Sequence, residues 1–235
     1  MSVGYVTLSR QSGLMREMQS VANNVANIST TGFRREGVVF SEYVTAAGGE
    51  SVSMAAARAR RIDLTTGTLE PTGGALDLAI HGNGFFQVET ASGVRLTRAG
   101  AFTPNEAGEL STPDGNLVLD EGGAPIFIPP DAAGIAVASD GTISADGRAI
   151  ARIGLVEPAD PADLSHEAGA LFAVAGEVVE VVDGNIQQGF LEGSNVNPVH
   201  EITRMIEVQR AYELGQSLIE RESDRVSNVI ETLTR

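Results

Sequence analysis

The sequence has no cysteine and no tryptophan, and aromatic residues make up only 5% of its 235 positions. Without cysteine, a disulfide framework, a thiol nucleophile and a cysteine-ligated metal are all excluded. Glycine, by contrast, occurs 27 times. Few aromatics and many glycines predict a modest core with many turns, which is not typical of a compact globular enzyme.

Long hydrophobic runs are also missing. No stretch approaches the roughly 18 apolar residues of a membrane-spanning helix. The N-terminal residues lack the basic region followed by an apolar run that marks a cleavable secretory signal. The hydrophobic content of 42% is enough for one core of ordinary size. On these features alone, the expectation is a cytoplasmic protein.

The net charge of −15 is unevenly distributed along the chain. Residues 1–70 carry seven arginines and six acidic residues, whereas residues 71–190 carry four arginines and seventeen acidic residues. The last 45 positions carry five arginines and eight acidic residues. Because phosphate groups would be repelled by the acidic middle, nucleic acid and anionic membranes are disfavoured as partners.

Both ends of the sequence show the periodicity of an amphipathic helix. Residues 4–28 place apolar side chains at spacings of four and three, which predicts one stripe at coiled-coil spacing that stops near Gly32. Near the other end, Asn197 and Pro198 form a plausible helix start. The stripe that follows is interrupted by Gly215 and Glu222, and it consists of Met205, Val208, Tyr212, Ile219, Val226, Val229 and Leu233.

Between the two helices the pattern changes. Residues 31–70 predict an extended connector, because the glycine pair and the alanine run offer little to bury. Residues 71–190 alternate short apolar stretches with turn signals such as Asp140-Gly141 and Asp146-Gly147, which predicts an antiparallel β domain. The expected fold class is therefore α+β, with segments 1–30 (helix), 31–70 (connector), 71–190 (β domain) and 191–235 (helix). The two stripes either pair with each other or face neighbouring subunits of an assembly.

No catalytic or ligand-binding pattern emerges. His81, His166 and His200 are far apart and lie in no metal-ligand motif. Gly82-Asn83-Gly84 lacks the strand, helix and lysine of a phosphate loop. The Asp-Gly turns lack the acid spacing of a calcium loop. The expectation is a protein that is not an enzyme and that has no cofactor, no metal, no nucleic-acid partner and no small-molecule substrate.

Three segments resemble one protein family. The first is Asn23-Asn24-Val25-Ala26-Asn27-Ile28-Ser29-Thr30-Thr31-Gly32-Phe33-Arg34, which resembles the N-terminal signature of flagellar axial proteins, the rod, hook and hook-associated proteins. Residues 194–206 and 209–213 resemble the matching C-terminal signature. In the middle, residues 76–86 and 97–102 resemble the rod and hook core. The three matches occur in the family's order, and details at 140–144, 153–156 and 191–196 resemble the proximal-rod type more than the distal-rod type.

This resemblance implies a structural subunit of the flagellar rod that transmits torque and forms the wall of the export channel. The terminal helices would pair as a coiled coil and line the inner tube, with the β domain outside. The family leaves the cell through the type III export apparatus without signal cleavage, so the implied location is the periplasmic rod of the basal body. The implied partners are copies of the chain itself, other rod subunits and that export apparatus.

Two sets of residues are predicted to make the assembly contacts. The N-terminal set is Leu14, Met18, Val21, Asn23, Asn24, Val25, Ala26, Asn27, Ile28, Thr30, Thr31, Gly32 and Phe33. The C-terminal set is Asn195, Pro198, Ile202, Met205, Ile206, Val208, Gln209, Arg210, Tyr212, Ile219, Val226, Val229 and Leu233. The alternatives are a distal-rod subunit and a periplasmic β-domain binding module with helical oligomerisation tails.

Overall fold

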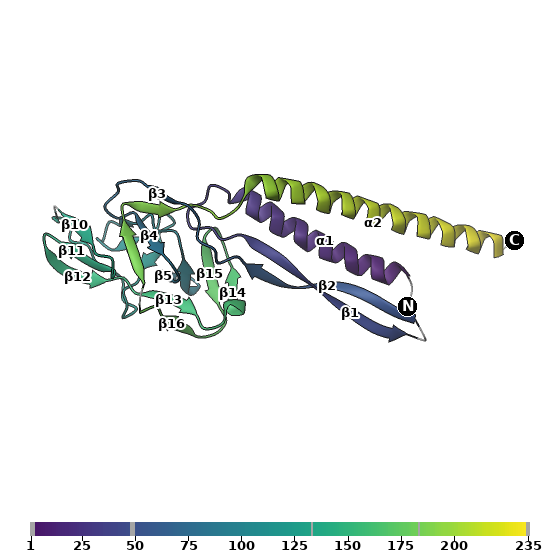
Figure 1. Ribbon diagram of the computed structural model, residues 1–235, viewed down its shortest axis with the longest axis horizontal. Helices are drawn as coiled ribbons and strands as arrows, with labels where there is room; N and C mark the ends of the chain where they lie inside the picture. Colours follow the sequence, from purple (N-terminus) through teal and green to yellow (C-terminus); the bar gives the residue numbers. More distant parts are fainter. Residues whose placement is uncertain (1–2, 48–49, 133, 183, 234–235) are drawn as a thin grey trace. The chain divides into compact units, whose positions relative to one another are not determined.

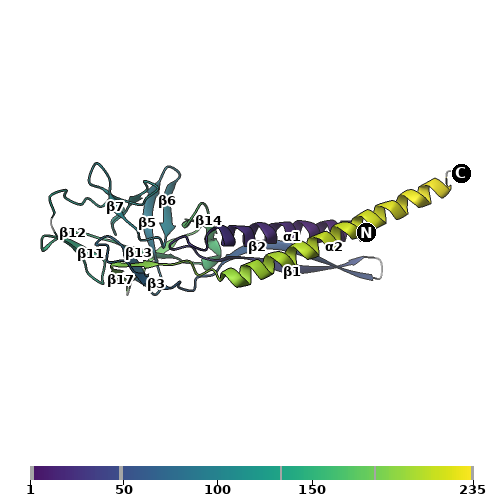
Figure 2. The same cartoon turned by 90° about the horizontal axis from the view of Figure 1, so that it is seen from above.

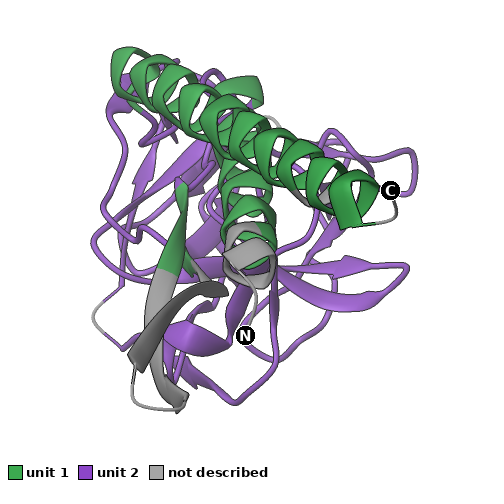
Figure 3. Cartoon of the chain, turned by 90° about the vertical axis from the view of Figure 1, so that its right-hand side faces the viewer, with its two compact units in different colours: residues 1–26, 36–61, 197–235 green, residues 27–35, 62–196 purple. Residues whose placement is uncertain are grey.

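The computed structural model describes residues 3–47, 50–132, 134–182 and 184–233. The chain divides into two compact units, shown in different colours in Figure 3. Unit 1 consists of residues 1–26, 36–61 and 197–235, and unit 2 consists of residues 27–35 and 62–196. Unit 1 is thus assembled from three separate stretches of sequence, and the chain passes between the units four times.

Unit 1 contains the two predicted helices and one small sheet. Helix α1 spans Val3–Ala26 and helix α2 spans Pro198–Leu233. Figures 1 and 2 both show α1 lying along the first part of α2. Where the sequence indicated an extended connector, strands β1 (Glu36–Ala47) and β2 (Glu50–Ile62) form a two-stranded sheet.

The start of α2 follows the predicted chemistry. Asn197 Oδ1 accepts a hydrogen bond from the His200 backbone N–H at 3.1 Å, which is an N-cap, and Pro198 occupies the first helical position. At 1.5 Å per residue, the 36 residues of α2 extend for about 54 Å and the 24 residues of α1 for about 36 Å. Helix α2 is therefore 12 residues longer than α1, which corresponds to about three turns or roughly 18 Å.

Unit 2 is an antiparallel β domain, as the sequence predicted. Its longest sheet has the order β14-β15-β6-β5-β9-β8-β7, with β13 pairing β5, and β16 pairing β13. Three smaller sheets have the orders β10-β11-β12, β17-β4 and β18-β3. The strands are β3 (Leu69–Pro71), β4 (Leu78–His81), β5 (Phe85–Thr90), β6 (Gly93–Thr97), β7 (Thr103–Pro104), β8 (Leu110–Ser111), β9 (Leu117–Val118), β10 (Ile135–Val137), β11 (Thr142–Ala145), β12 (Arg148–Arg152), β13 (Leu155–Pro158), β14 (Leu164–His166), β15 (Leu171–Val174), β16 (Val178–Glu180), β17 (Asn185–Gln188) and β18 (Phe190–Glu192); the short 3-10 helix η1 covers Pro161–Asp163.

The turn between β11 and β12 shows how local sequence fixes the register. Asp146 and Gly147 both have positive φ, 49° and 77°, as a two-residue hairpin turn of the mirror-image type requires. Aspartate and glycine tolerate that backbone, whereas a β-branched residue would not. The Asp-Gly signal in the sequence therefore marks a real hairpin.

The core of unit 2 lies on both faces of the longest sheet. Neighbouring side chains on a strand point to opposite faces, so Phe85 and Phe86 of β5 enter different clusters. Phe86 meets Phe102 edge to face at 5.2 Å between ring centroids, and Phe85 meets Phe172 at 5.4 Å. These buried aromatics anchor the sheet although aromatics are scarce in the sequence.

The end of α1 differs from the sequence-based expectation. Gly32 was expected to terminate the helix, but α1 ends at Ala26, six residues earlier. Gly32 does have a positive φ of 69°, yet it serves a different contact. A Cβ atom built on it would lie 2.2 Å from the backbone nitrogen of Ala99, so the glycine permits two backbone segments of unit 2 to touch.

Candidate assembly site

The face that α1 buries is more polar than its apolar stripe suggested. Of the predicted stripe only Val21 is buried, while Leu14, Met18, Val25 and Ile28 are half-buried. The buried polar residues of α1 are Gln11, Glu17, Ser20 and Asn24. The helix therefore turns a mainly polar face inward and keeps part of its apolar stripe accessible.

Polar contacts join α1 to α2. Gln11 Nε2 donates a hydrogen bond to the Tyr212 carbonyl oxygen at 3.0 Å, and Arg204 Nε donates to Glu17 Oε1 at 2.7 Å. Gly215 lies at the same crossing, where an added Cβ would come within 2.7 Å of Gln11 Nε2. The glycine that interrupts the predicted stripe thus makes room for the Gln11 side chain.

Asn24 makes three hydrogen bonds on this face. Its side chain is fully buried; Nδ2 donates to the Glu36 carbonyl oxygen at 2.8 Å, and Oδ1 accepts from the Glu36 N–H at 2.9 Å. Nδ2 also donates to Glu201 Oε2 at 3.0 Å, on the first turns of α2. One amide therefore connects α1, the start of β1 and α2, which the sequence did not reveal.

The stripe on α2 divides into a covered and an uncovered part. Val208 is buried, with 2% of its surface exposed, and Met205, Tyr212 and Ile219 are half-buried. Beyond the reach of α1, Val229 is 50% exposed and Leu233 81% exposed; the side chain of Val226 lies outside the described ones. The other exposed apolar side chains of α2 are Val199, Ile202, Ile206, Leu214, Leu218 and Ile230.

The remaining predicted residues fall into three groups by exposure. Ala26, Pro198, Gln209 and Arg210 are exposed. Asn23, Asn27, Thr30, Thr31 and Asn195 are half-buried, and Thr30 Oγ1 donates to Asn27 Oδ1 at 3.0 Å. Gly32 and Phe33 are buried within unit 2 rather than on the helices.

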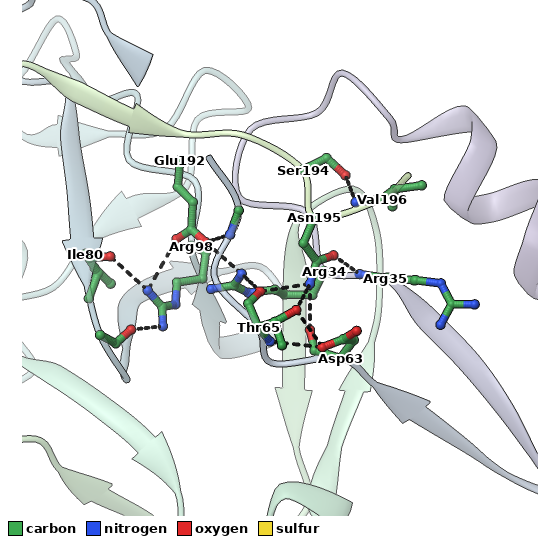
Figure 4. Close-up of polar contacts among 12 residues, drawn as sticks. Arg34, Arg35, Asp63, Thr65, Ile80, Arg98, Glu192, Ser194, Asn195 and Val196 are labelled. Atoms are coloured by element: carbon green, nitrogen blue, oxygen red, sulfur yellow. Dashed lines mark hydrogen bonds and ion pairs between the residues drawn. The ribbon is translucent and has the colours of Figure 1, made fainter. Parts of the chain in front are cut away.

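Three charged residues form a buried arginine–glutamate cluster in unit 2: Arg34, Arg98 and Glu192 (Figure 4). Arg34 Nη1 lies 2.7 Å from Glu192 Oε1, and Arg98 Nη1 lies 3.3 Å from Glu192 Oε2. All three side chains are at most 3% exposed. Glu192 Oε1 also accepts a hydrogen bond from the Gly67 N–H at 2.9 Å. One carboxylate thus serves two guanidinium groups and a backbone amide.

Burial affects how readily these arginines hold their charge. Burial lowers the pKa of Arg98 to about 10, and the nearby positive charge of Arg34 acts in the same direction. Burial also lowers the pKa of Arg34, although the carboxylates of Glu192 and Asp63 oppose this effect. Arg98 remains cationic near neutral pH, because a pKa of about 10 lies well above it.

Asn195 extends the cluster by hydrogen bonds to two other segments. Its Oδ1 accepts from the Arg35 N–H at 2.6 Å, and its Nδ2 donates to the carbonyl oxygens of Asp63 at 3.0 Å and Thr65 at 2.9 Å. Partial burial raises the pKa of the Asp63 carboxyl, but hydrogen bonds from the Thr65 N–H and hydroxyl and the charges of Arg35 and Arg34 outweigh it. The pKa of Asp63 therefore lies below its usual value.

Phe33 and His166 complete the packing around these segments. The Phe33 side chain is fully buried, and its ring stacks on the His166 ring at 4.8 Å between centroids. His166 Nε2 lies 2.7 Å from the Arg34 carbonyl oxygen. His166 thus packs against Phe33 and contacts the backbone of Arg34.

The residues of the buried polar networks that sequence reasoning missed are Arg34, Arg98, Glu192, Glu36 and Glu201. Arg34 and Arg98 lie inside the segments that resemble the family signatures. A charged residue flanked by apolar ones, as in Phe190-Leu191-Glu192, was the available signal for a buried ion pair. Within the described ranges, no cluster of histidine and acidic side chains could hold a metal ion, and no helix is both long and apolar enough to span a membrane.

Comparison with known proteins agrees with these elements. The model of the flagellar hook protein FlgE/F/G D1 domain matches residues 79–145, and that of the flagellar basal body rod FlgEFG protein C-terminal region matches residues 187–232. The chain is 40% identical to the flagellar basal-body rod protein FlgF of Caulobacter vibrioides, over 97% of this chain and 96% of the relative. It is 39% identical to FlgF of Mesorhizobium japonicum with the same coverage, and 32% identical to FlgG of Bacillus subtilis over 92% of both chains.

Proposed function

Because the chain belongs to the family of flagellar basal-body rod proteins, as a structural subunit of the FlgF type, we propose that it polymerises through its terminal helices. In this proposal α1 and α2 pair as a coiled coil and pack beside those of neighbouring subunits. The packed helices transmit torque and form the wall of the export channel. The subunit belongs to the proximal part of the rod, below the distal FlgG-type subunits.

The uncovered apolar surface of α2 carries this proposal. Ile202, Leu218 and Val229 are each about half exposed within the chain, at 52%, 52% and 50%. A helix that leaves apolar side chains uncovered along its length is stabilised when other surfaces cover them, at roughly 25 cal/mol per Å². A helical array of identical contacts supplies such a cover for every subunit.

Unit 1 alone offers limited support to its helices. Its buried apolar side chains in the described part of α1 and α2 are few, chiefly Val21 and Val208. We infer that the helices become fully ordered when neighbours cover them, because the ordering entropy is then offset by the new contacts. If the terminal helices become ordered only on assembly, the chain can pass unfolded through the type III export apparatus. It would reach the periplasm this way without signal cleavage.

The partners follow from the family. Membership implies assembly with other flagellar rod and hook components. We propose that the direct neighbours are copies of this chain and the adjoining rod subunits, met through unit 1, while the 71–190 region faces outward. We propose two domains. The pair of helices lines the tube with residues 36–61 beside it, and the β domain forms a separate outer domain. We assign the chain no catalytic step.

Two other functions remain as competing proposals. A distal-rod subunit rests on the 32% identity to a FlgG protein, which is lower than the 40% identity to FlgF. A periplasmic binding module with helical oligomerisation tails would instead use the β domain for a ligand and form a closed, soluble oligomer. The three differ in where the chain accumulates.

Localisation in the basal body tests the proposal. An epitope inserted beside the exposed Ser92, in the β5–β6 turn, would be followed by gold-labelled antibody on rods freed from their rings. We expect label on the rod segment nearest the membrane ring. Label further out would favour the distal type, and recovery of the chain in a soluble closed oligomer would favour the binding module.

A further inference from the structure

The segments that lead from unit 2 to unit 1 lie beside one another within unit 2. The chain changes units after residues 26, 35, 61 and 196. The three stretches of unit 2 that adjoin these points are 27–35, 62–67 and 190–196. They are separated by up to about 160 residues in sequence, yet backbone and side-chain hydrogen bonds connect them directly.

These connections run between every pair of the three stretches. Gly32 N donates to the Glu192 carbonyl oxygen at 2.7 Å, which joins the first and third. Asp63 N donates to the Arg35 carbonyl oxygen at 2.8 Å, which joins the second and first. The Gly67 N–H donates to Glu192 Oε1 at 2.9 Å, which joins the second and third. The three stretches therefore form one closed network.

The arginine–glutamate cluster attaches this network to the β domain. Arg98 follows β6, and its Nη2 and Nη1 donate to the carbonyl oxygens of Gly82 at 2.6 Å and Ile80 at 3.3 Å. The same Nη1 reaches Glu192, which also holds Arg34 of the first stretch. The Glu192 carboxylate therefore accepts from Arg34 of the first stretch, from Gly67 of the second and from Arg98 beside the sheet.

We propose that Glu192 is a positioning residue for rod assembly: it holds the stretches that lead to α1, β1, β2 and α2 at fixed spacing. A force on unit 1 is then transmitted to unit 2 at the four points where the chain passes between the units. One buried ionic network holds the segments of unit 2 that adjoin these points. This inference rests on the proposed function, because only an assembled rod carries such a load.

The buried charges make this role sensitive to a single substitution. If Glu192 loses its negative charge, two guanidinium groups that are 1% and 3% exposed face each other without their shared carboxylate. A buried cation that loses its counter-charge is strongly destabilised where it stands. The three stretches should then separate locally, while the sheet core around Phe86 keeps its packing.

Glu192→Gln in the full chain tests the proposal, because glutamine keeps the size and an acceptor for Gly67 N–H but removes the charge. Hydrogen exchange should accelerate by at least about tenfold at the amides of Gly32, Asp63 and Gly67, and stay unchanged in strands β5 and β6. In a strain lacking the native protein, this variant should yield far fewer complete rods than the unmodified chain does.

Two controls separate positioning from simple loss of stability. Glu167→Gln removes the same charge from the exposed pair with Arg95 and should leave exchange and rod number unchanged. Val118→Ala, in the sheet core, lowers the melting temperature without touching the network and should still yield rods.

The proposal fails if Glu192→Gln shows unaltered exchange at the three stretches, or builds rods as well as the unmodified chain. It also fails if Val118→Ala, at a similar melting temperature, loses rods to the same degree. Failure of the unmodified chain to restore any rods would instead count against the proposed function itself, so the two failures can be told apart.

Discussion

At the scale of single residues, Gly32 is a position where both the backbone conformation and a close neighbour disfavour a side chain. Gly32→Ala combines a φ of 69° with a Cβ placed 2.2 Å from the Ala99 nitrogen. We expect the free energy of unfolding to fall by more than about 3 kcal/mol, because strain and backbone overlap add. Chemical denaturation of the purified chain measures this loss.

Gly147→Ala is the matched control for that change. Its φ is 77°, but no atom lies within 4 Å of the added Cβ. This variant should lower the free energy of unfolding only by the left-handed backbone strain, about 1 kcal/mol. If both variants lose the same free energy of unfolding, the close approach of Gly32 to Ala99 does not add to the cost of the Gly32 substitution.

Asp63 makes the stability of the folded chain depend on pH in a direction that can be predicted. An unfolded aspartate titrates near pH 3.9, and the folded pKa of Asp63 lies lower. Its contribution to stability is therefore present above about pH 4 and is lost as the pH falls through the folded pKa. Thermal unfolding of the chain and of Asp63→Asn should differ most above that pH and converge below it. A difference that grows on acidification would contradict this assignment.

The sequence indicated some of these residue roles and concealed others. The Asp146-Gly147 hairpin follows from local backbone chemistry, so it could be predicted. Asn24 could not, because its three hydrogen bonds reach Glu36 and Glu201, partners 12 and 177 residues away. A buried polar residue is fixed by distant groups that no local pattern identifies.

At the scale of elements, the uncovered end of α2 separates assembly from folding. Val229→Asp places a charge on a side chain that is 50% exposed in the single chain. The thermal unfolding of unit 2 should therefore stay unchanged, while rod incorporation and swimming should be abolished because the charge would be buried between subunits. Motility of a complemented deletion strain measures the outcome.

Asn228→Asp supplies the control, since it adds the same charge one residue away on an exposed position outside the apolar stripe. That variant should swim. Normal swimming of Val229→Asp as well would contradict the assignment of this face to a subunit interface.

Limited proteolysis tests whether α2 becomes ordered on assembly. All basic residues of the chain are arginine, and Arg221 and Arg225 lie exposed on α2. Trypsin should cut the isolated chain there at low concentration, whereas Arg34 and Arg98, at most 3% exposed, should be spared. The same α2 sites should be protected in rods. Resistance of α2 in the dilute isolated chain would show that its order does not depend on neighbours.

The elements themselves were predictable to different degrees. The two helices and the antiparallel strands follow from periodicity and turn chemistry, which are local. Strands β1 and β2 were not recognised, because the small residues of 44–57 give no alternating apolar pattern. The polar inner face of α1 was also missed, since Glu17, Ser20 and Asn24 are buried only because specific partners satisfy them.

At the scale of the whole molecule, charge and apolar surface are divided along the chain. The acidic residues are concentrated in 71–190, whereas uncovered apolar side chains recur along α2. This division suits a subunit whose helices make contacts and whose β domain stays solvated. The sequence resembled the family in three segments, but it did not show which surfaces of neighbouring subunits meet. A partner's surface is not encoded in local periodicity.

The central claim, that neighbouring subunits cover the end of α2, can be tested by thiol accessibility. The chain has no native cysteine, so Val229→Cys carries a single reactive site. A maleimide should label this thiol rapidly in the isolated chain, and at least about tenfold more slowly in purified basal bodies that contain the variant. Equal labelling rates in the two states would contradict the account.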